Sequence, residues 1–521
     1  MTQSPVESRA LLDPVALSVF VSALSGIAEE MGAVLVRSSY SSNIKERRDC
    51  SCALFDADGR MVAQAEHIPV HLGAMHEAVE AVRARSPEPG DVFIVNDPFS
   101  GGTHLPDITL VSPIDLSGEI VGYAVSRAHH SDVGGMTPGS MPSESRSIYQ
   151  EGIVIPPLRL VRGGALVEEV LELVLANVRT PEIRRVDLLA QAAANTLGAE
   201  RLRALAERHG LPRLRASFDE VIAYGERRTR AVLAALPDGT FEAEGELEGD
   251  GVVDEDIPIR LAVTIAGDAV RVDFAGTAGP AAGNVNCPLA VTRSACLFAL
   301  RTLLPADVPI NAGSAAPLEL RVSEPSLVSA RRPSAVVAGN VETSQRIADV
   351  VLAAFGKAVE VPAAGQGTMN NVIIGGADWT YYETIGGGQG ASAAGRGPSG
   401  VHVGMSNTLN TPVEALELEF PLRIEAYELR YGSGGRGVHA GGDGIERRIR
   451  VLEPATLSLL ADRRRHGPAG RAGGEAGACG ENLLDGEPVR AKHTSELRPG
   501  QVVTVRTPGG GGWGAPPPER R

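Results

Sequence analysis

The sequence has 521 residues, of which 43% are hydrophobic and 22% are charged. A chain of this length exceeds one ordinary compact core, so we expect several packed lobes. Lys and Arg number 49 against 64 Asp and Glu, which gives a formal net charge of -15. A chain this acidic lacks the positive surface that nucleic acids and anionic membranes require, and we expect neither as a partner.

The cysteines and the N-terminal segment indicate a cytoplasmic protein. The five cysteines are an odd number without a repeated Cys-x-x-Cys spacing, which fits free thiols in a reducing compartment. Residues 1–14 contain no basic stretch followed by an apolar core, so they do not resemble a secretory signal. The apolar run over 15–28 is interrupted by serines and closed by Glu29 and Glu30. We therefore expect a core helix there rather than a membrane span.

The first elements are a helix, a hairpin and a second helix. Asp13 and Pro14 predict a helix start, because Asp accepts from free backbone N–H groups and Pro needs no donor at the first helical position. Apolar residues at helical spacing continue to Met31. Residues 49–65 predict a hairpin with its turn at 57–59. A loop then leads into a helix, and three strand-like runs follow over 91–96, 108–114 and 119–128.

The rest of the chain changes from helical to β-rich. Residues 181–236 predict two long helices divided at Gly210, residues 240–274 alternate as strands, and a helix is expected over about 346–357. Glycine clusters at 386–390, 432–437, 441–444 and 509–514 lack the form of a phosphate-binding loop, so we expect turns and bent β connections. The prediction is a mixed α/β (α+β), multi-lobed fold. An N-terminal α/β lobe with helices and strands covers 1–240, and a β-rich, glycine-rich region covers 241–521.

The densest group of potentially reactive side chains lies at two strand ends, within 96–107 and 126–132. His104 and Asp107 are separated by three residues, and Pro106 between them favours a loop. Two imidazoles and a carboxylate suit Zn²⁺, Mn²⁺ or Fe²⁺, and three protein ligands leave positions open for water or substrate. His129 and His130 point to opposite faces if the strand continues through them, so we expect only one of the two to bind the metal.

Each of these residues has a simpler interpretation when it is taken alone. Asp97 could shape a turn, His104 could lie on the surface, and His130 could be a hydrogen-bonded core residue. The grouping of six such residues, including Asp132, favours the metal site. His67 and His71 could join it or pack at a helix start, and their roles stay open; His76 is expected to be structural. No Gly-x-Ser-x-Gly motif is present, so no serine triad is assigned.

Several motifs together resemble the hydantoinase B / 5-oxoprolinase family. In chain order they are HIPVHLGAM, NDPFSGGTHLPD, SRAHHSDVGG, VDFAGT, GNVETSQR, GQGTMNN, SGGRGVHAGGDG and PGGGGWG. The resemblance extends from about residue 13 to residue 513. The family includes subunits of ATP-dependent N-methylhydantoinase and 5-oxoprolinase, caprolactamase, and the acetone and acetophenone carboxylases.

The resemblance also implies ligands and a partner. In the carboxylases the matching subunit holds a divalent metal through a His, an Asp three residues on, and a His 25 residues after the first, a pattern that falls on His104, Asp107 and His129. It therefore selects His129 and leaves Asp97, His130 and Asp132 as candidates for acid–base catalysis. A hydantoinase A-type partner subunit would bind ATP and phosphorylate a carbonyl oxygen, which implies a hetero-oligomer.

We therefore expect the metal-binding catalytic subunit of an ATP-dependent hydrolase of cyclic amides such as 5-oxoproline or hydantoins. An amide carbonyl is a poor electrophile, and phosphorylation of its oxygen makes it reactive. A divalent metal lowers the pKa of water toward neutrality, and a nearby His or Asp can take the proton. The alternatives are a subunit of an ATP-dependent carboxylase, in which the same site directs a one-carbon unit to a carbanion, and a non-catalytic assembly subunit.

Overall fold

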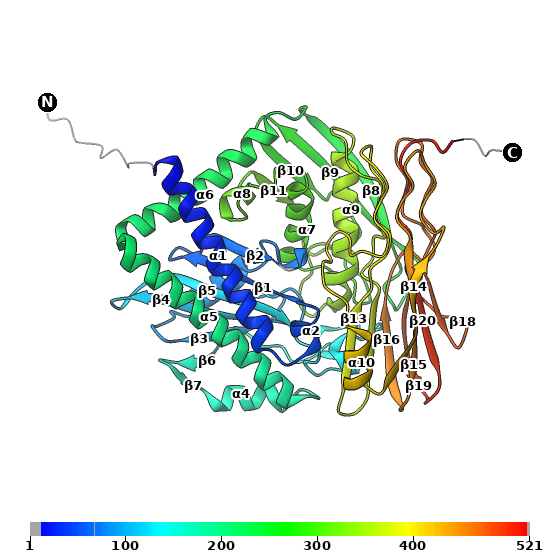
Figure 1. Ribbon diagram of the computed structural model, residues 1–521, viewed down its shortest axis with the longest axis horizontal. Coiled ribbons are helices and arrows are strands. Elements are labelled where there is room, and N and C mark those ends of the chain that lie inside the picture. The colour runs from blue at the N-terminus through cyan, green and yellow to red at the C-terminus, as the bar shows by residue number, and fades with distance from the viewer. Residues whose placement is uncertain (1–11, 67, 518–521) are drawn as a thin grey trace.

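The computed structural model describes residues 12–66 and 68–517 (Figure 1). Within these residues the chain combines helices with four β-sheets, which confirms the mixed α/β class. All five cysteines are free, as expected, and four of them are buried.

A seven-stranded antiparallel sheet forms the centre of the N-terminal part, in the order β2-β1-β5-β4-β3-β6-β7. Its strands are β1 (Cys50–Asp56), β2 (Met61–Glu66), β3 (Val92–Val95), β4 (Asp107–Leu116), β5 (Glu119–His129), β6 (Leu158–Arg162) and β7 (Ala165–Leu166). The expected hairpin and the three strand-like runs are confirmed. Strands β4 and β5 are neighbours in antiparallel register, and their pairing begins with Asp107 opposite His129. This register brings two sequence-distant polar residues together at one end of the sheet.

Two long helices, α1 (Pro14–Ser38) and α5 (Pro181–His209), cover one face of this sheet, and α6 (Leu211–Leu233) packs beside them at the β2 edge (Figure 1). Helix α1 begins as expected, because the Asp13 side chain accepts a hydrogen bond from the backbone N–H of Ala16. The helix is long and apolar enough to cross a membrane by length and composition alone. Its buried side chains, however, share one apolar cluster with α5, α6 and the sheet, as the core helix of a folded domain does. Gly210 adopts a positive φ of 82° and separates α5 from α6, as the sequence predicts.

Shorter elements complete this part of the chain. They are α2 (Ser42–Lys45), η1 (Pro69–His71), α3 (His76–Arg83), η2 (Pro138–Ser140), η3 (Ile148–Gln150) and α4 (Glu168–Leu175).

The C-terminal part contains three more sheets. The second sheet has the order β11-β10-β9-β8, the third β13-β12-β16-β19 and the fourth β14-β15-β20-β17-β18. Their strands are β8 (Gly239–Glu248), β9 (Asp256–Ala266), β10 (Ala269–Asp273), β11 (Leu318–Arg321), β12 (Asn371–Gly375), β13 (Thr380–Thr384), β14 (Leu422–Arg430), β15 (Gly444–Val451), β16 (Ala455–Leu460), β17 (Glu481–Leu484), β18 (Glu487–Pro488), β19 (Lys492–Leu497) and β20 (Val502–Arg506). The accompanying helices are α7 (Leu289–Arg301), α8 (Ala312–Ala315), the π-helix η4 (Gly339–Thr343), α9 (Ser344–Phe355) and α10 (Val413–Glu419).

One apolar cluster joins the two parts of the chain. It combines Ile68, Val70 and Met141 with side chains of β9, α7, α9 and β12. Helices α7 and α9 pack against each other, and α9 also packs on β8 and β9. Segments of the N-terminal part therefore pack directly against C-terminal elements, and the domain boundary near residue 240 stays a prediction.

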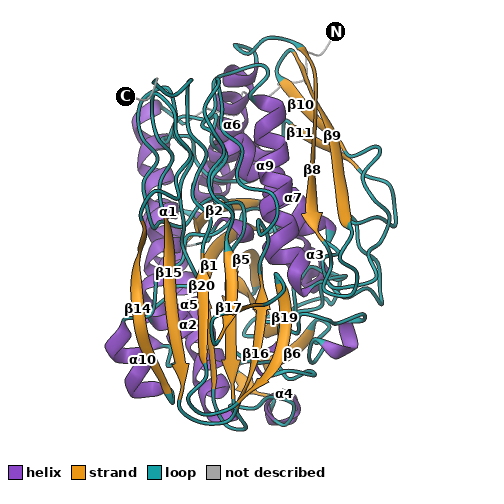
Figure 2. Cartoon of the chain, turned by 90° about the vertical axis from the view of Figure 1, so that its right-hand side faces the viewer, coloured by secondary structure: helices purple, strands orange, loops and turns teal. Residues whose placement is uncertain are grey.

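The glycine clusters form long segments beyond the ends of the C-terminal strands (Figure 2). These segments lie side by side through backbone hydrogen bonds, such as Gly388 N to Pro508 O at 3.0 Å and Gly510 N to Gly442 O at 2.9 Å. A Cβ atom on Gly388 would lie 2.0 Å from Gly442 O. Backbone thus packs directly on backbone, which explains why the sequence uses glycine there. The final cluster, at 509–514, is packed among the others.

We expect Gly442→Ala to destabilise the fold strongly. An added Cβ would lie 1.8 Å from Pro398 O and 2.5 Å from Pro398 C, both backbone atoms of a packed segment. Relief of such an overlap requires backbone movement, with a cost of about 3 kcal/mol or more. The measurement is the thermal unfolding midpoint. Gly395→Ala is the matched control, because its Cβ would meet nothing within 4 Å. Equal midpoints for the two variants would contradict the direct backbone packing.

Candidate metal centre

Three side chains converge at the end of the seven-stranded sheet. His104 Nε2 and His129 Nδ1 each lie 3.1 Å from Asp107 Oδ1, and the two nitrogen atoms are 3.2 Å apart. His104, Asp107 and His129 are all 3% exposed or less. Their three donor atoms lie within 4.8 Å of one another, as the ligands of one metal ion would. The structure therefore brings together the three residues that the sequence predicts as metal ligands.

The donor set fits a divalent cation in spacing and in charge. Ligand atoms bound at 2.0–2.1 Å to a tetrahedral ion lie about 3.3 Å apart, close to the spacing found here. Burial alone would raise the pKa of Asp107, but the charge of His104 and the contacts of three histidines hold it well below its usual range, so Asp107 is a carboxylate. Burial lowers the pKa of His129, which favours the neutral imidazole that binds metals.

The chain reaches this arrangement through a sharp loop between β3 and β4. A Cβ on Gly102 would lie 2.2 Å from Asn96 O, and Gly101 has a positive φ of 100°. Asn96 fixes the loop, because its Nδ2 donates to Leu105 O at 2.8 Å and its Oδ1 accepts from Ile155 N at 2.6 Å. The loop thus turns His104 back over the first residue of β4.

The second oxygen of Asp107 has its own set of neighbours. Thr103 Oγ1 donates to Asp107 Oδ2 at 2.5 Å, and Asn340 Nδ2 lies 3.4 Å from the same atom. His71 Nε2 also lies 3.4 Å from Oδ2, while its Nδ1 is 3.1 Å from Ser51 Oγ. These contacts orient the carboxylate so that Oδ1 faces the two imidazoles. His71, whose role the sequence leaves open, therefore adjoins the centre; His67 lies outside the described residues.

An aromatic ring fixes the imidazole of His129. Tyr382 of β13 stacks on His129 with 4.6 Å between ring centroids and 25° between planes. The Arg47 guanidinium lies 4.5 Å from the Tyr382 ring centroid, and Tyr382 Oη donates to Asn371 Oδ1 at 2.9 Å. Arg47, Tyr382 and Asn371 are all buried. The C-terminal part of the chain thus supplies part of the wall of a centre whose ligands come from the N-terminal part.

Asp97 does not reach the three ligands. Its Oδ1 accepts from Phe99 N at 3.1 Å, and its Oδ2 accepts from Ser100 Oγ at 3.1 Å and Arg332 Nη2 at 2.7 Å. These contacts are those of a residue that shapes the loop before His104, the simpler of its two interpretations.

His130 and Asp132 also have partners other than the three ligands. His130 Nε2 lies 2.9 Å from Gln191 Oε1 of α5, on the opposite side of the strand from His129. Burial and the charge of Arg184 lower the pKa of His130 to about 4. Asp132 accepts hydrogen bonds from three backbone N–H groups and from Arg179 Nη1. The contacts of both residues support the backbone after β5, so they give the expected acid–base role no support.

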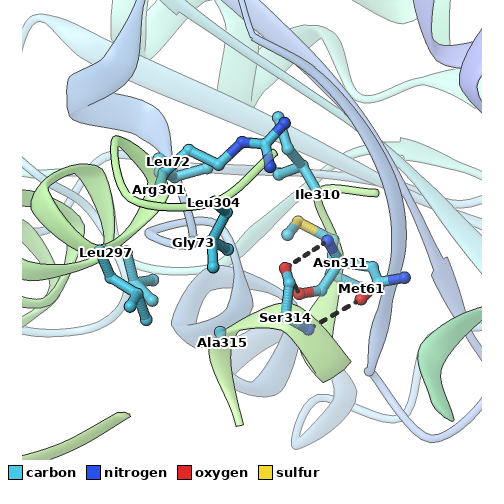
Figure 3. A pocket seen from close by; sticks show the side chains of 11 residues that line it. Met61, Leu72, Gly73, Leu297, Arg301, Leu304, Ile310, Asn311, Ser314 and Ala315 are labelled. Carbon is cyan, nitrogen blue, oxygen red and sulfur yellow. Dashed lines mark hydrogen bonds between the residues drawn. The ribbon is translucent and has the colours of Figure 1, made fainter. Parts of the chain in front are cut away.

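Two pockets of the described chain are not lined by the three candidate ligand residues. A pocket of about 30 Å³ between Leu72, Leu297 and Ala315 is mainly apolar (Figure 3), with room for roughly one or two waters. A larger pocket of about 410 Å³ borders the loop at Phe99 and Gly101. None of the three metal-ligand candidates lines either pocket, and His76 lines the rim of the larger one.

Comparison with known proteins identifies the family. Residues 13–516 match the family model described as hydantoinase B/oxoprolinase. The chain belongs to this family. Among curated relatives, an uncharacterized protein of Methanocaldococcus jannaschii is 42% identical over 97% of this chain and 91% of its own length. The 5-oxoprolinase 1 of Arabidopsis thaliana is 40% identical over 96% of this chain, but the match spans only 42% of that protein.

Two solved structures are similar to this chain in overall fold. An ATP-dependent caprolactamase from Pseudomonas jessenii has a TM-score of 0.90 and 28% identity over 97% of this chain and 92% of its own. An acetone carboxylase has a TM-score of 0.84 at 18% identity over 96% of this chain and 76% of its own, which shows a shared fold.

Four of the eight motifs by which the chain resembles this family meet at the centre. HIPVHLGAM supplies His71, NDPFSGGTHLPD supplies His104 and Asp107, and SRAHHSDVGG supplies His129. GNVETSQR supplies Asn340, which contacts Asp107. Motifs that are far apart in the sequence thus contribute to one site.

Proposed function

We propose that this chain is the metal-binding, hydrolytic subunit of an ATP-dependent cyclic amide hydrolase that works with a hydantoinase A-type partner in the cytoplasm. The convergence of His104, Asp107 and His129 carries the proposal, because two imidazoles and a carboxylate leave coordination positions open. Family membership and the likeness to 5-oxoprolinases and to a caprolactamase support the substrate class. The five free thiols agree with a reducing compartment.

His104, Asp107 and His129 would hold the metal. A divalent ion bound there supplies Lewis-acid polarisation of a carbonyl or phosphoryl oxygen. Asp107 contributes its Oδ1 as a carboxylate, since Thr103, His71 and Asn340 surround Oδ2. Tyr382 keeps the His129 ring in place by stacking on it. Such outer contacts are expected to tune metal affinity about 10- to 100-fold.

The partner would supply the activation step. It transfers the γ-phosphoryl group of ATP to the amide oxygen and releases ADP. Water then adds to the activated carbon, the ring C–N bond opens with a proton delivered to nitrogen, and phosphate leaves with consumption of a second water. Asp97, His130 and Asp132 would support the backbone around the centre, as their contacts favour.

The centre would have to open for the substrate to enter. His71, His104, Asp107 and His129 are each 3% exposed or less in the chain alone, so a lactam ring has no direct approach from bulk water. Exclusion of water protects a reactive phosphorylated intermediate from unproductive hydrolysis. We assign the opening to movement of the surrounding segments when the partner or the substrate binds.

The test is product analysis of the reconstituted pair with ATP and a panel of 5-oxoproline, hydantoin and caprolactam. We expect at least one ring-opened amino acid to form in proportion to ADP. ATP consumption that requires bicarbonate and gives a carboxylated product, with no ring opening, would overturn the proposal in favour of a carboxylase.

A further inference from the structure

The carboxamide of Asn340 has one atom engaged and, within the described part of the chain, one atom without a partner next to Asp107, a candidate metal ligand. The residue is 2% exposed, and its Nδ2 donates to Asp107 Oδ2 at 3.4 Å. Its Oδ1 is buried and has no hydrogen-bond partner among the described residues. An unsatisfied buried amide oxygen is costly to the folded state, and native proteins rarely leave one without a reason. A donor that enters with a ligand would satisfy it.

The neighbouring Asp107 carboxylate determines which end of the Asn340 side-chain amide is the nitrogen and which is the oxygen. Asp107 Oδ2 is a hydrogen-bond acceptor, so only the NH₂ group of Asn340 can bond to it. The atom left over is therefore the oxygen, which offers an acceptor beside Asp107.

The backbone that carries Asn340 is held in place on several sides. It belongs to the π-helix η4, a type of turn that is frequent at functional sites. Ser344 Oγ donates to Asn340 O at 2.7 Å, and Gly339 N donates to Asn284 O at 3.1 Å. A Cβ on Gly339 would lie 1.9 Å from Asn286 O, so this segment sits directly on its neighbour. The backbone at Asn340 is thus held rigidly, as a residue that determines substrate specificity requires.

We propose that Asn340 Oδ1 accepts a hydrogen bond from the ring N–H of the substrate and makes this enzyme selective for secondary lactams. The inference rests on the proposed function and names its substrate class. An amide within a small ring is cis, so its N–H and C=O lie on the same edge. With the carbonyl at the candidate ligands, a lactam that presents this edge toward Asp107 would place its N–H next to Asn340, whose Nδ2 lies 3.4 Å from Asp107 Oδ2.

This contact predicts discrimination against N-alkyl lactams. An N-methyl lactam has no hydrogen to donate, and its methyl group would press against the buried oxygen of Asn340. Sites built to hydrogen-bond a substrate N–H reject analogues that lack it, because the polar group of the site is then left unpaired. Asn340 would act by contact with the substrate, while His71 and Tyr382 act by positioning the ligands.

The experiment compares the affinities of 5-oxoproline and N-methyl-5-oxoproline for the metal-loaded complex of the chain with its A-type partner, measured by calorimetry without ATP. We expect wild type to prefer the N–H form about 10- to 100-fold. With metal at saturating concentration, so that loss of the Asn340–Asp107 contact does not empty the site, Asn340→Leu should weaken 5-oxoproline binding by the same factor and barely change binding of the N-methyl form, so the preference disappears. Asn195→Leu is the control, since Asn195 has an equally buried, unpartnered Oδ1 but lies on α5 against β4.

The outcomes separate the role of Asn340 from the proposed hydrolase function. A preference that is absent in wild type, or that survives in Asn340→Leu, overturns the assignment of Asn340. Loss of the preference in Asn195→Leu as well would trace it to general packing and also overturn the assignment. A complex could bind with the expected preference and yet open no lactam upon addition of ATP. That result would support the contact between Asn340 and the substrate N–H, and it would overturn the proposed hydrolase function instead.

Discussion

Replacement of His104, Asp107 or His129 with alanine is expected to strip the metal from the purified protein. Each substitution removes one of three donor atoms that lie 3.1–3.2 Å apart, so the affinity should fall by more than the about 10- to 100-fold typical of an outer contact. Replacement of His71 with Ala, or of Tyr382 with Leu, should cause that smaller loss. The measurement is metal content at low free-metal concentration, with far-UV circular dichroism to confirm the fold.

His76→Ala is the matched control for the ligand variants. His76 is a histidine of the same part of the chain, but its Nδ1 contacts Gly59 O at 3.0 Å, away from the three ligands. Its loss should leave metal content unchanged. Full metal occupancy in His104→Ala and His129→Ala, together with metal loss in His130→Ala, would show that the ligand set is wrong.

The isolated chain is expected to hydrolyse no ATP in response to substrate, and addition of the A-type partner should restore coupled turnover. The sequence lacks a Gly-x4-Gly-Lys loop. The glycine clusters do not replace it, because many of their N–H groups already donate within the chain, as Gly388 N does to Pro508 O and Gly510 N to Gly442 O. Such groups are not free to cradle phosphate. The measurement is ADP release with each subunit alone and mixed; robust lactam-dependent ATP turnover by this chain alone would refute the division of labour.

The grouping of His104, Asp107 and His129 was within reach of sequence reasoning, because local rules place them at strand ends and the family resemblance selects His129 over His130. His104 and Asp107 share one short loop, and the alternation of side chains along a strand predicts that His129 and His130 face opposite sides. The structure confirms that alternation, with His129 at Asp107 and His130 at Gln191. The extension of β5 to His129 then places it opposite Asp107.

The rest of the centre depends on contacts that local patterns do not encode. Asn340 lies 233 residues from Asp107 in the sequence, and Tyr382 reaches His129 from a different sheet. Only the packing of the C-terminal part on the first sheet brings them there. The acid–base role of Asp97 and Asp132 stays a prediction. The hydrogen bonds that their carboxylates accept from nearby backbone N–H groups are contacts that the sequence pattern does not predict.

We propose that this chain opens the ring after the partner has activated it. The most direct test is one assay of the reconstituted complex carrying Asp107→Asn, in which ADP–ATP exchange and ring-opened product are followed together with 5-oxoproline. Because Asp107 lies in this chain and activation is assigned to the partner, exchange should continue near the wild-type rate while product formation falls to background. Ring opening at the wild-type rate in this variant would contradict the account.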